Sequence, residues 1–214
     1  MVNDYHIHSV LCKHATGSLP EYAREARDRG ITEICATDHI PAPGGYDSQN
    51  RMEMIQFGEY RNILQGSRTD GVSIRFGIEA DYHESELPFQ KKWLPEQKFD
   101  FVLGSVHYLR DWAFDNPTKV KMWEMVDVKG VWKAYFKLIV KLAKARLYDC
   151  VAHLDLPKKF GHTPPEKEVN EMAKPALDAI AKAEMSIEIN TSGLRNPAKE
   201  IYPSPFLVQM ALER

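Results

Sequence analysis

Histidines are the residues whose types and spacing stand out in this chain. It has 214 residues and eight histidines, and the first two, His6 and His8, flank a single isoleucine. In a β-strand both imidazoles would point to one face while Ile7 points to the other. Such a pair can clamp a metal ion at the nitrogen distance of roughly 2.0–2.1 Å that zinc prefers. A His-x-His pair alone is a weak signal, because a strand-end histidine often has only a structural role.

Further candidate ligands end later apolar runs: His39, Glu79, His107 and His153. Each has an ordinary explanation alone, since an imidazole can cap a carbonyl and a glutamate is usually solvated. Five successive strands with an imidazole or carboxylate at the same end predict a metal centre instead. His14 lies in the loop after the first pair, and this nearness favours ligation over a surface role. Mixed histidine and carboxylate ligands suit zinc, manganese or iron, and their number predicts two or three divalent ions.

The elements that must position these residues alternate between short apolar runs and helical patterns. Strands are expected over 5–9, 31–37, 72–80, 99–106, 149–153 and 185–190, and helices over 18–29, 52–65 and 129–146, from 163 and from 204. Ser18 and Glu21 have the spacing of a capping box, and Gly30 is placed to end that helix. Repeated βα order predicts a parallel sheet, either a barrel or a doubly wound sheet. Ligands gather at the carboxyl strand ends of both.

Composition excludes several classes of protein. Hydrophobic residues make up 43% and charged residues 27%, as in ordinary globular domains. The net charge of -2 gives no basic surface for nucleic acid. No apolar run approaches the roughly 18–20 residues that cross a membrane, and the N-terminus lacks a signal-peptide pattern. The three cysteines, Cys12, Cys35 and Cys150, form no Cys-x-x-Cys pair, and Cys12 is expected to be a small buried residue. A cytoplasmic protein without nucleic-acid or membrane partners is predicted.

The ordered set of candidate ligands resembles the polymerase and histidinol phosphatase (PHP) family. The matching positions are His6-x-His8, His14, Asp38-His39, Glu79, His107 and His153. The run from His6 to Gly17 and the run from Glu188 to Arg195 are similar to the histidinol-phosphatases of that family. The resemblance covers nearly the whole chain and implies a distorted seven-stranded (β/α) barrel with three metal ions. It also implies one PHP-type domain over 1–214.

Carried over by motif, the resemblance implies three ligand sets. His6, His8 and Glu79 would hold the first metal, Glu79, His107 and His153 the second, and His14 with His39 the third. Family members continue into a seventh strand with an Asp-x-His motif that adds ligands to the first and third metals. This sequence ends at Arg214 before such a strand, so we expect a longer natural chain that supplies it.

The expected chemistry is hydrolysis of a phosphate monoester, with L-histidinol phosphate as the substrate that the resemblance implies. Metal ions activate water and offset the charge on phosphoryl oxygens. Arg195 is the first choice for a bidentate phosphate contact, and Lys158 and Lys159 could assist, although adjacent lysines are usually solvated. Asp155 could protonate the leaving group or bind a substrate amine. Asp38 is expected to orient His39 or another ligand.

Three other functions remain open at this point. A phosphoesterase of the same family could act on nucleotides or oligonucleotides, although the acidic balance argues mildly against a polymer. The chain could be a non-catalytic metal-binding module, or a metal-dependent hydrolase of amide bonds on a similar barrel. His83 and His162 lie away from the expected strand ends and are predicted to be exposed or to face substrate.

Overall fold

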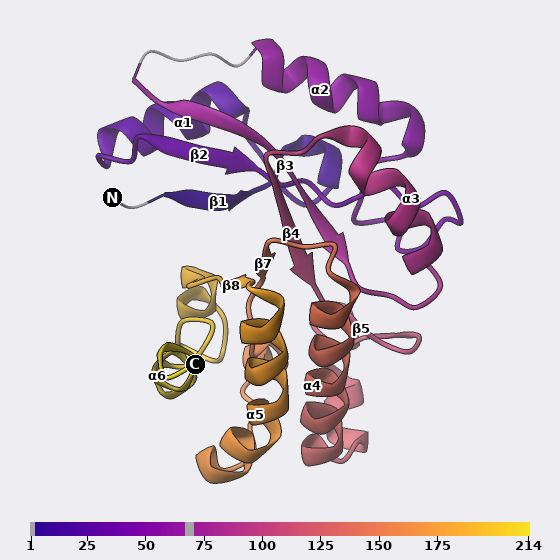
Figure 1. The fold of residues 1–214 in the computed structure, drawn as a ribbon, viewed down its shortest axis with the longest axis vertical. Coiled ribbons are helices and arrows are strands. Elements are labelled where there is room, and N and C mark those ends of the chain that lie inside the picture. Colours follow the sequence, from indigo (N-terminus) through magenta and orange to yellow (C-terminus); the bar gives the residue numbers. More distant parts are fainter. Residues whose placement is uncertain (1–2, 67–70) are drawn as a thin grey trace. The chain divides into compact units, whose positions relative to one another are not determined.

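The computed structural model describes residues 3–66 and 71–214, which form two compact units (Figure 1). Unit 1 contains residues 1–81 and 85–103, and unit 2 contains residues 82–84 and 104–214. Each unit is described by itself. Strand β4, Phe101–Ser105, belongs to unit 1 in its first three residues and to unit 2 in its last two.

Unit 1 is built on parallel strands in the order β1-β2-β3, followed by the start of β4. The strands are β1 (Asp4–Ile7), β2 (Glu33–Ala36) and β3 (Ser73–Asp81). The helices are η1 (Val10–Cys12), α1 (Leu19–Asp28), η2 (Met54–Gln56), α2 (Phe57–Gly66) and α3 (Leu87–Gln97). Ile34 pairs with Ile74 in a regular register, and β1 joins β2 through Ile7 and Ala36.

Local signals explain where α1 begins and ends. The backbone amide of Ser18 donates to Oε2 of Glu21 over 2.7 Å, and the capping box is complete. Gly30, at a φ of +75°, adopts the left-handed conformation that follows many helices and costs glycine least. Leu19, Ala23 and Ala26 are the buried side chains of α1.

An aromatic core packs under the sheet of unit 1. Phe57 and Trp93 meet edge to face at 4.6 Å, and Phe76 and Phe99 have their ring centres 4.6 Å apart. The fully buried Tyr60 places its hydroxyl 2.8 Å from the carbonyls of Ala36 in β2 and Gly77 in β3. The hydroxyl thus ties neighbouring strands together.

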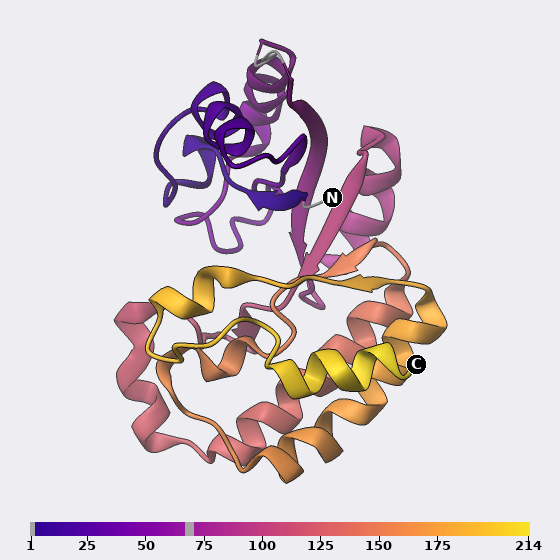
Figure 2. The ribbon, with the colours of Figure 1, turned by 90° about the vertical axis from the view of Figure 1, so that its left-hand side faces the viewer.

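Unit 2 continues the parallel order from β4 to β7 and β8. Its strands are β5 (Tyr108–Leu109), β6 (Trp112–Ala113), β7 (Cys150–Val151) and β8 (Ser186–Ile187). Its helices are η3 (Pro117–Met125), α4 (Val128–Ala145), η4 (Leu156–Phe160), α5 (Glu166–Ala183), η5 (Thr191–Arg195) and α6 (Pro205–Leu212). The two long helices α4 and α5 pack together, and α6 packs against α5 (Figure 2).

The packing of α4 follows the apolar period that the sequence predicts. Its buried side chains, Val131, Trp132, Tyr135, Phe136, Ile139, Leu142 and Ala143, recur at helical spacing. Asp127 caps the helix by accepting a hydrogen bond from the amide of Lys129 at 3.1 Å. Among the residues that the structure describes, no helix is both long and apolar enough to cross a membrane.

The α/β class with a parallel sheet of six strands is confirmed, and every predicted strand and helix is present. The strands β7 and β8 are only two residues long, shorter than predicted. The helix α3, the β5-β6 hairpin and η3 were not predicted. Helix α3 holds Pro88 in its first turn and Pro95 inside, and such residues hide a helix from periodicity. A single domain over 1–214 stays a prediction.

Candidate metal centre

Three histidines of unit 1 surround the carboxylate of Glu79. Its Oε2 lies 3.1 Å from Nε2 of His6, 3.2 Å from Nε2 of His8 and 3.4 Å from Nδ1 of His39. The two Nε2 atoms of His6 and His8 are themselves 3.1 Å apart. The Glu79 side chain is only 1% exposed, and a buried carboxylate needs compensating positive charge.

The spacing of these atoms fits a bound cation. Nitrogen ligands at 2.0–2.1 Å around a tetrahedral zinc ion would lie roughly 3.3 Å from one another. The separations of 3.1 and 3.2 Å between His6, His8 and Glu79 are close to that value. These three residues therefore form a ligand group that a zinc-like ion fits without a large rearrangement.

Strand geometry places this group as the sequence predicts. His6 and His8 lie at the carboxyl end of β1 on one face, and Ile7 is buried on the other. His39 pairs with Glu79 in a parallel bridge, in which the amide of Glu79 donates to the carbonyl of Asp38 at 2.9 Å. Adjacent strand ends thus deliver their side chains to one place.

Asp38 lies beside His8, one of the candidate ligands that it was expected to orient. The amide of Ser9 donates to Oδ1 of Asp38 at 2.6 Å, and the Ser9 hydroxyl donates to Oδ2. The same carboxylate lies 3.7 Å from Nδ1 of His8. Burial lowers the pKa of His8, but interactions with Asp38, Cys12 and Glu79 raise it well above its ordinary value. The surroundings of His8 therefore favour a positive charge.

His14 and Cys12 form a second ligand group together with His8. Nδ1 of His14 lies 2.8 Å from the carbonyl oxygen of Cys12, so it carries the proton and leaves Nε2 as the ligand atom. The His14 ring centre is 5.3 Å from those of His8 and His39. Cys12 is buried, as expected, but its place beside two imidazoles was not predicted. Burial raises the pKa of its thiol, and hydrogen bonds with His14 and His8 lower it to about 6.

Arg51 and Asp81 form a buried ion pair beside His39, and neither was predicted to be part of the site. The guanidinium of Arg51 is 2% exposed, bonds the carboxylate of Asp81 and donates to the carbonyl of Ile40 at 2.9 Å. The other oxygen of Asp81 lies 3.8 Å from Nδ1 of His39. The buried cation thus fixes a carboxylate next to a candidate ligand.

Unit 2 brings together the two remaining candidates. Nε2 of His107 lies 3.2 Å from Nε2 of His153, and the ring centres are 5.0 Å apart. His107 follows β4 and His153 follows β7, so strand ends again supply the imidazoles. His153 is 6% exposed, with an unusual backbone φ of +26°. Two imidazole nitrogens at this separation suit shared coordination of one ion.

Asp155 and Lys158 form a buried polar network instead of an open substrate site. The Lys158 ammonium lies within 2.8 Å of oxygens from four residues: Asp155, Glu200, Ile201 and Ser204. Its three protons are therefore matched by protein acceptors, which argues against the predicted phosphate contact. Burial raises the pKa of the Asp155 carboxyl, and Lys158 and Ser204 partly offset this effect.

The remaining predicted residues have varied surroundings. Lys159 is half-buried and pairs with Asp115 at 3.1 Å, whereas Arg195 is exposed at the end of η5. His83 is half-buried. His162 is half-buried rather than exposed, and it is stacked on Trp123 with ring centres 5.0 Å apart and planes within 3°. These placements keep Lys159 and Arg195 as the candidate phosphate contacts.

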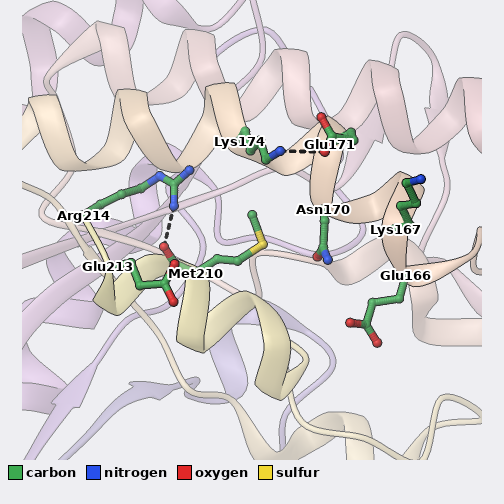
Figure 3. A pocket seen from close by; sticks show the side chains of 8 residues that line it. All are labelled: Glu166, Lys167, Asn170, Glu171, Lys174, Met210, Glu213 and Arg214. Carbon is green, nitrogen blue, oxygen red and sulfur yellow. Dashed lines mark hydrogen bonds and ion pairs between the residues drawn. The ribbon is translucent and has the colours of Figure 1, made fainter.

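A separate polar hollow lies between α5 and α6 (Figure 3). It is lined by Glu166, Lys167, Asn170, Glu171, Lys174, Met210, Glu213 and Arg214. None of these residues belongs to the histidine groups. Lys174 is paired with Glu171 at 2.6 Å, and the lining contains no histidine or cysteine.

Fold and site together define a class of protein: an α/β protein with a parallel sheet whose strand ends gather metal-binding side chains. The chain belongs to the PHP domain family, whose sequence profile matches residues 4–192. The family resemblance seen in the motifs is thereby confirmed.

Relatives in sequence carry consistent names. The chain is 42% identical over 214 residues to a Deinococcus radiodurans protein named probable histidinol-phosphatase, a match that covers 99% of this chain and 81% of that protein. It is 27% identical over 238 residues to the histidinol-phosphatase of Bacillus subtilis, covering 99% and 88%.

Solved structures show the same fold. A crystal structure of a candidate histidinol phosphatase from Listeria monocytogenes matches with a TM-score of 0.84 at 21% identity, covering 99% of this chain and 91% of that one. The histidinol phosphate phosphatase of Lactococcus lactis, complexed with zinc, L-histidinol and phosphate, matches with a TM-score of 0.76 at 23% identity, covering 94% and 77%. The predicted fold class, that of the distorted PHP barrel, is confirmed.

Proposed function

We propose that this protein is a metal-dependent phosphatase that hydrolyses L-histidinol phosphate to L-histidinol and phosphate. The observation that carries the proposal is the convergence of His6, His8 and His39 on one buried oxygen of Glu79. Relatives at 42% and 27% identity over nearly the whole chain are named for this activity, and they support the substrate. The reaction belongs to histidine biosynthesis.

The ligands are assigned within each unit. In unit 1, His6, His8 and Glu79 hold one ion, and His14 with His39 contributes to another. In unit 2, His107 and His153 act together. Two or three divalent ions, zinc, manganese or iron, suit these nitrogen and oxygen donors. Zinc is the metal in the Lactococcus complex.

Bound divalent ions supply a Lewis acid that activates water near neutral pH and stabilises charge on the phosphoryl group. The chain's own contribution is to place imidazoles and one carboxylate before the substrate arrives, so little reorganisation is needed during the reaction. Arg195 contacts the phosphate through its planar guanidinium, and Lys159 adds positive charge. Asp155 is fully buried against Lys158 and Ser204, so we assign it no direct contact with the leaving group.

The surroundings of the thiols support a cytoplasmic location. All three cysteines are buried and none forms a disulfide bond, as in proteins of reducing compartments. The substrate is a small phosphate monoester, and we propose no nucleic-acid or membrane partner, in keeping with the net charge of -2.

The test is phosphate release from L-histidinol phosphate by protein loaded separately with zinc, manganese or iron. A panel of nucleotides, an oligonucleotide and an amide substrate is assayed in parallel. We expect turnover of L-histidinol phosphate well above the panel, and loss of turnover on metal removal with recovery on reloading. The His107→Ala variant should lose hydrolysis while keeping its thermal unfolding transition.

Each other outcome identifies a different function. Preference for nucleotides would indicate a phosphoesterase with another substrate, and cleavage of the amide a different hydrolase. Metal binding without turnover of any substrate would indicate a binding module. Full activity of His107→Ala would refute the metal assignment in unit 2.

A further inference from the structure

The parallel ladder between β7 and β8 stops immediately before His153. The amide of Ser186 donates to the carbonyl of Asp149, and the amide of Glu188 donates to the carbonyl of Val151, each at 3.0 Å. In a continued parallel ladder, the amide of His153 would next donate to the backbone carbonyl of Glu188.

The side chain of Glu188 replaces this missing hydrogen bond. The amide of His153 donates to Oε2 of Glu188 over 2.8 Å. His153 has a φ of +26°, a conformation that non-glycine residues rarely adopt and that surrounding contacts must hold in place.

The other backbone group of His153 is also held by a side chain. Tyr135, fully buried in α4, donates its hydroxyl to the carbonyl of His153 at 3.1 Å. Glu188, which follows β8, and Tyr135 in α4 therefore hold the two backbone groups of His153, whose Nε2 lies 3.2 Å from Nε2 of His107.

We infer that Glu188 is a positioning residue for the metal centre, which holds the backbone of His153 so that its imidazole is aligned with His107 before an ion binds. This inference rests on the proposed role of His153 as a ligand. Glu188 contributes through the reach of its carboxylate to the amide. Partners of ligands typically contribute about 10- to 100-fold in metal affinity or activity.

The requirement for reach makes three substitutions at this position informative. Glu188→Gln keeps the chain length and an oxygen that accepts a hydrogen bond, but removes the charge. Glu188→Asp keeps the charge but is one methylene shorter, and Glu188→Ala removes the acceptor. Glu184→Gln, at an exposed residue after α5, is the matched control.

The experiment is titration of the metal-free protein with Zn²⁺ or Mn²⁺ against a competing chelator, with the number and affinity of the bound ions as the readout. His153→Ala identifies the ion that depends on unit 2. We expect Glu188→Ala and Glu188→Asp to weaken that same ion by about 10- to 100-fold. Glu188→Gln and Glu184→Gln should stay within about threefold of the parent protein.

Metal affinity is measured without substrate, so the result is independent of the phosphatase activity. If Glu188→Asp and Glu188→Ala bind every ion as tightly as the parent protein, the inference is wrong. If Glu188→Gln weakens the ion as much as Glu188→Ala, charge and not reach is the contribution, which also overturns it. A folded parent protein that binds metal but hydrolyses no phosphate ester would refute only the proposed function. Thermal unfolding of Glu188→Asp separates misplacement of His153 from loss of the fold.

Discussion

The two units gather candidate ligands by different means. In unit 1, the nine-residue strand β3 and its neighbour β2 run in regular register to the bridge between His39 and Glu79. In unit 2, β7 and β8 are two residues long, and the chain leaves the ladder before His153. There the side chains of Glu188 and Tyr135 hold the backbone. The regular β2–β3 ladder thus places Glu79 through the backbone, whereas the backbone of His153 depends on side-chain supports.

The difference also appears in what surrounds the imidazoles. His6, His8 and His39 of unit 1 share one buried carboxylate oxygen, so a single residue connects several ligands. The described contacts of unit 2 join one imidazole directly to another. A change at the shared carboxylate should therefore affect several ligands at once, whereas a change at a support in unit 2 should affect one.

The largest effect is expected from Glu79→Gln. This substitution keeps the side-chain volume and removes the charge that three imidazoles surround. A ligand should matter more than a supporting residue, so we expect kcat/KM to fall by more than about 100-fold, together with loss of bound metal. Metal content and kinetics measured on the same preparation check this.

The Glu79→Gln variant should still fold in the absence of metal. Glu59→Gln, at an exposed glutamate of α2, is the control and should match the parent. Unchanged metal content in Glu79→Gln would show that Glu79 is not a metal ligand. The proposed difference between the two units would then be wrong.

Ligands placed by strand geometry could be predicted from the sequence, whereas the side chains that support them could not. His6, His8, His39 and Glu79 could be predicted because strand alternation and parallel order fix their direction. The roles of Asp81, Arg51 and Glu188 could not, because each depends on a hydrogen bond to a residue distant in sequence. Lys158 could not be placed from sequence for the same reason. Two adjacent lysines suggest exposed cations, but oxygens of four residues surround the ammonium of Lys158.

A second comparison concerns one buried cation in each unit. Arg51 is 2% exposed and pairs with Asp81, and Lys158 is 4% exposed and pairs with Asp155. Breaking a buried pair leaves an uncompensated charge, so Arg51→Ala and Lys158→Ala should each lower the free energy of unfolding by about 3–5 kcal/mol. Urea unfolding of the metal-free variants measures this.

The two variants should differ in metal binding. Asp81 lies 3.8 Å from His39, so Arg51→Ala should also weaken an ion held in unit 1. Arg75→Ala, which breaks an exposed pair with Glu33, is the control and should change stability little. A loss of under about 1 kcal/mol for either buried cation would contradict its structural role.

Arg195→Ala tests whether this exposed arginine of unit 2 contacts the phosphate of the substrate. Loss of a charged phosphate contact typically costs about 1.5–3 kcal/mol, so we expect a rise of about 10- to 100-fold in KM for L-histidinol phosphate. An exposed site away from packing should change stability by less than about 0.5 kcal/mol. Steady-state kinetics of Arg195→Ala, Lys159→Ala and the exposed control Arg24→Ala measure this. An effect confined to Lys159→Ala would assign the phosphate contact to that lysine instead.

The smallest effects should come from removing one hydroxyl in each unit. Tyr60 and Tyr135 are both fully buried; the Tyr60 hydroxyl lies at two backbone carbonyls, and the Tyr135 hydroxyl donates to the carbonyl of His153. Replacement by phenylalanine leaves a carbonyl without this donor, so each variant should lose about 1 kcal/mol of stability. In Tyr60→Phe the ladder between β2 and β3 remains, and activity per folded molecule should be unchanged.

Tyr135→Phe should behave differently, because its acceptor is the carbonyl of His153 in a strained backbone conformation. We expect a similar loss of stability together with a weaker ion at His107 and His153, by a few-fold, less than for Glu188→Ala. Chelator competition and urea unfolding of both phenylalanine variants check this. If both variants lose stability alone, backbone support of His153 comes from Glu188 without Tyr135. If Tyr60→Phe also weakens metal binding, the regular strands of unit 1 depend on side-chain supports as well, and the contrast between the units fails.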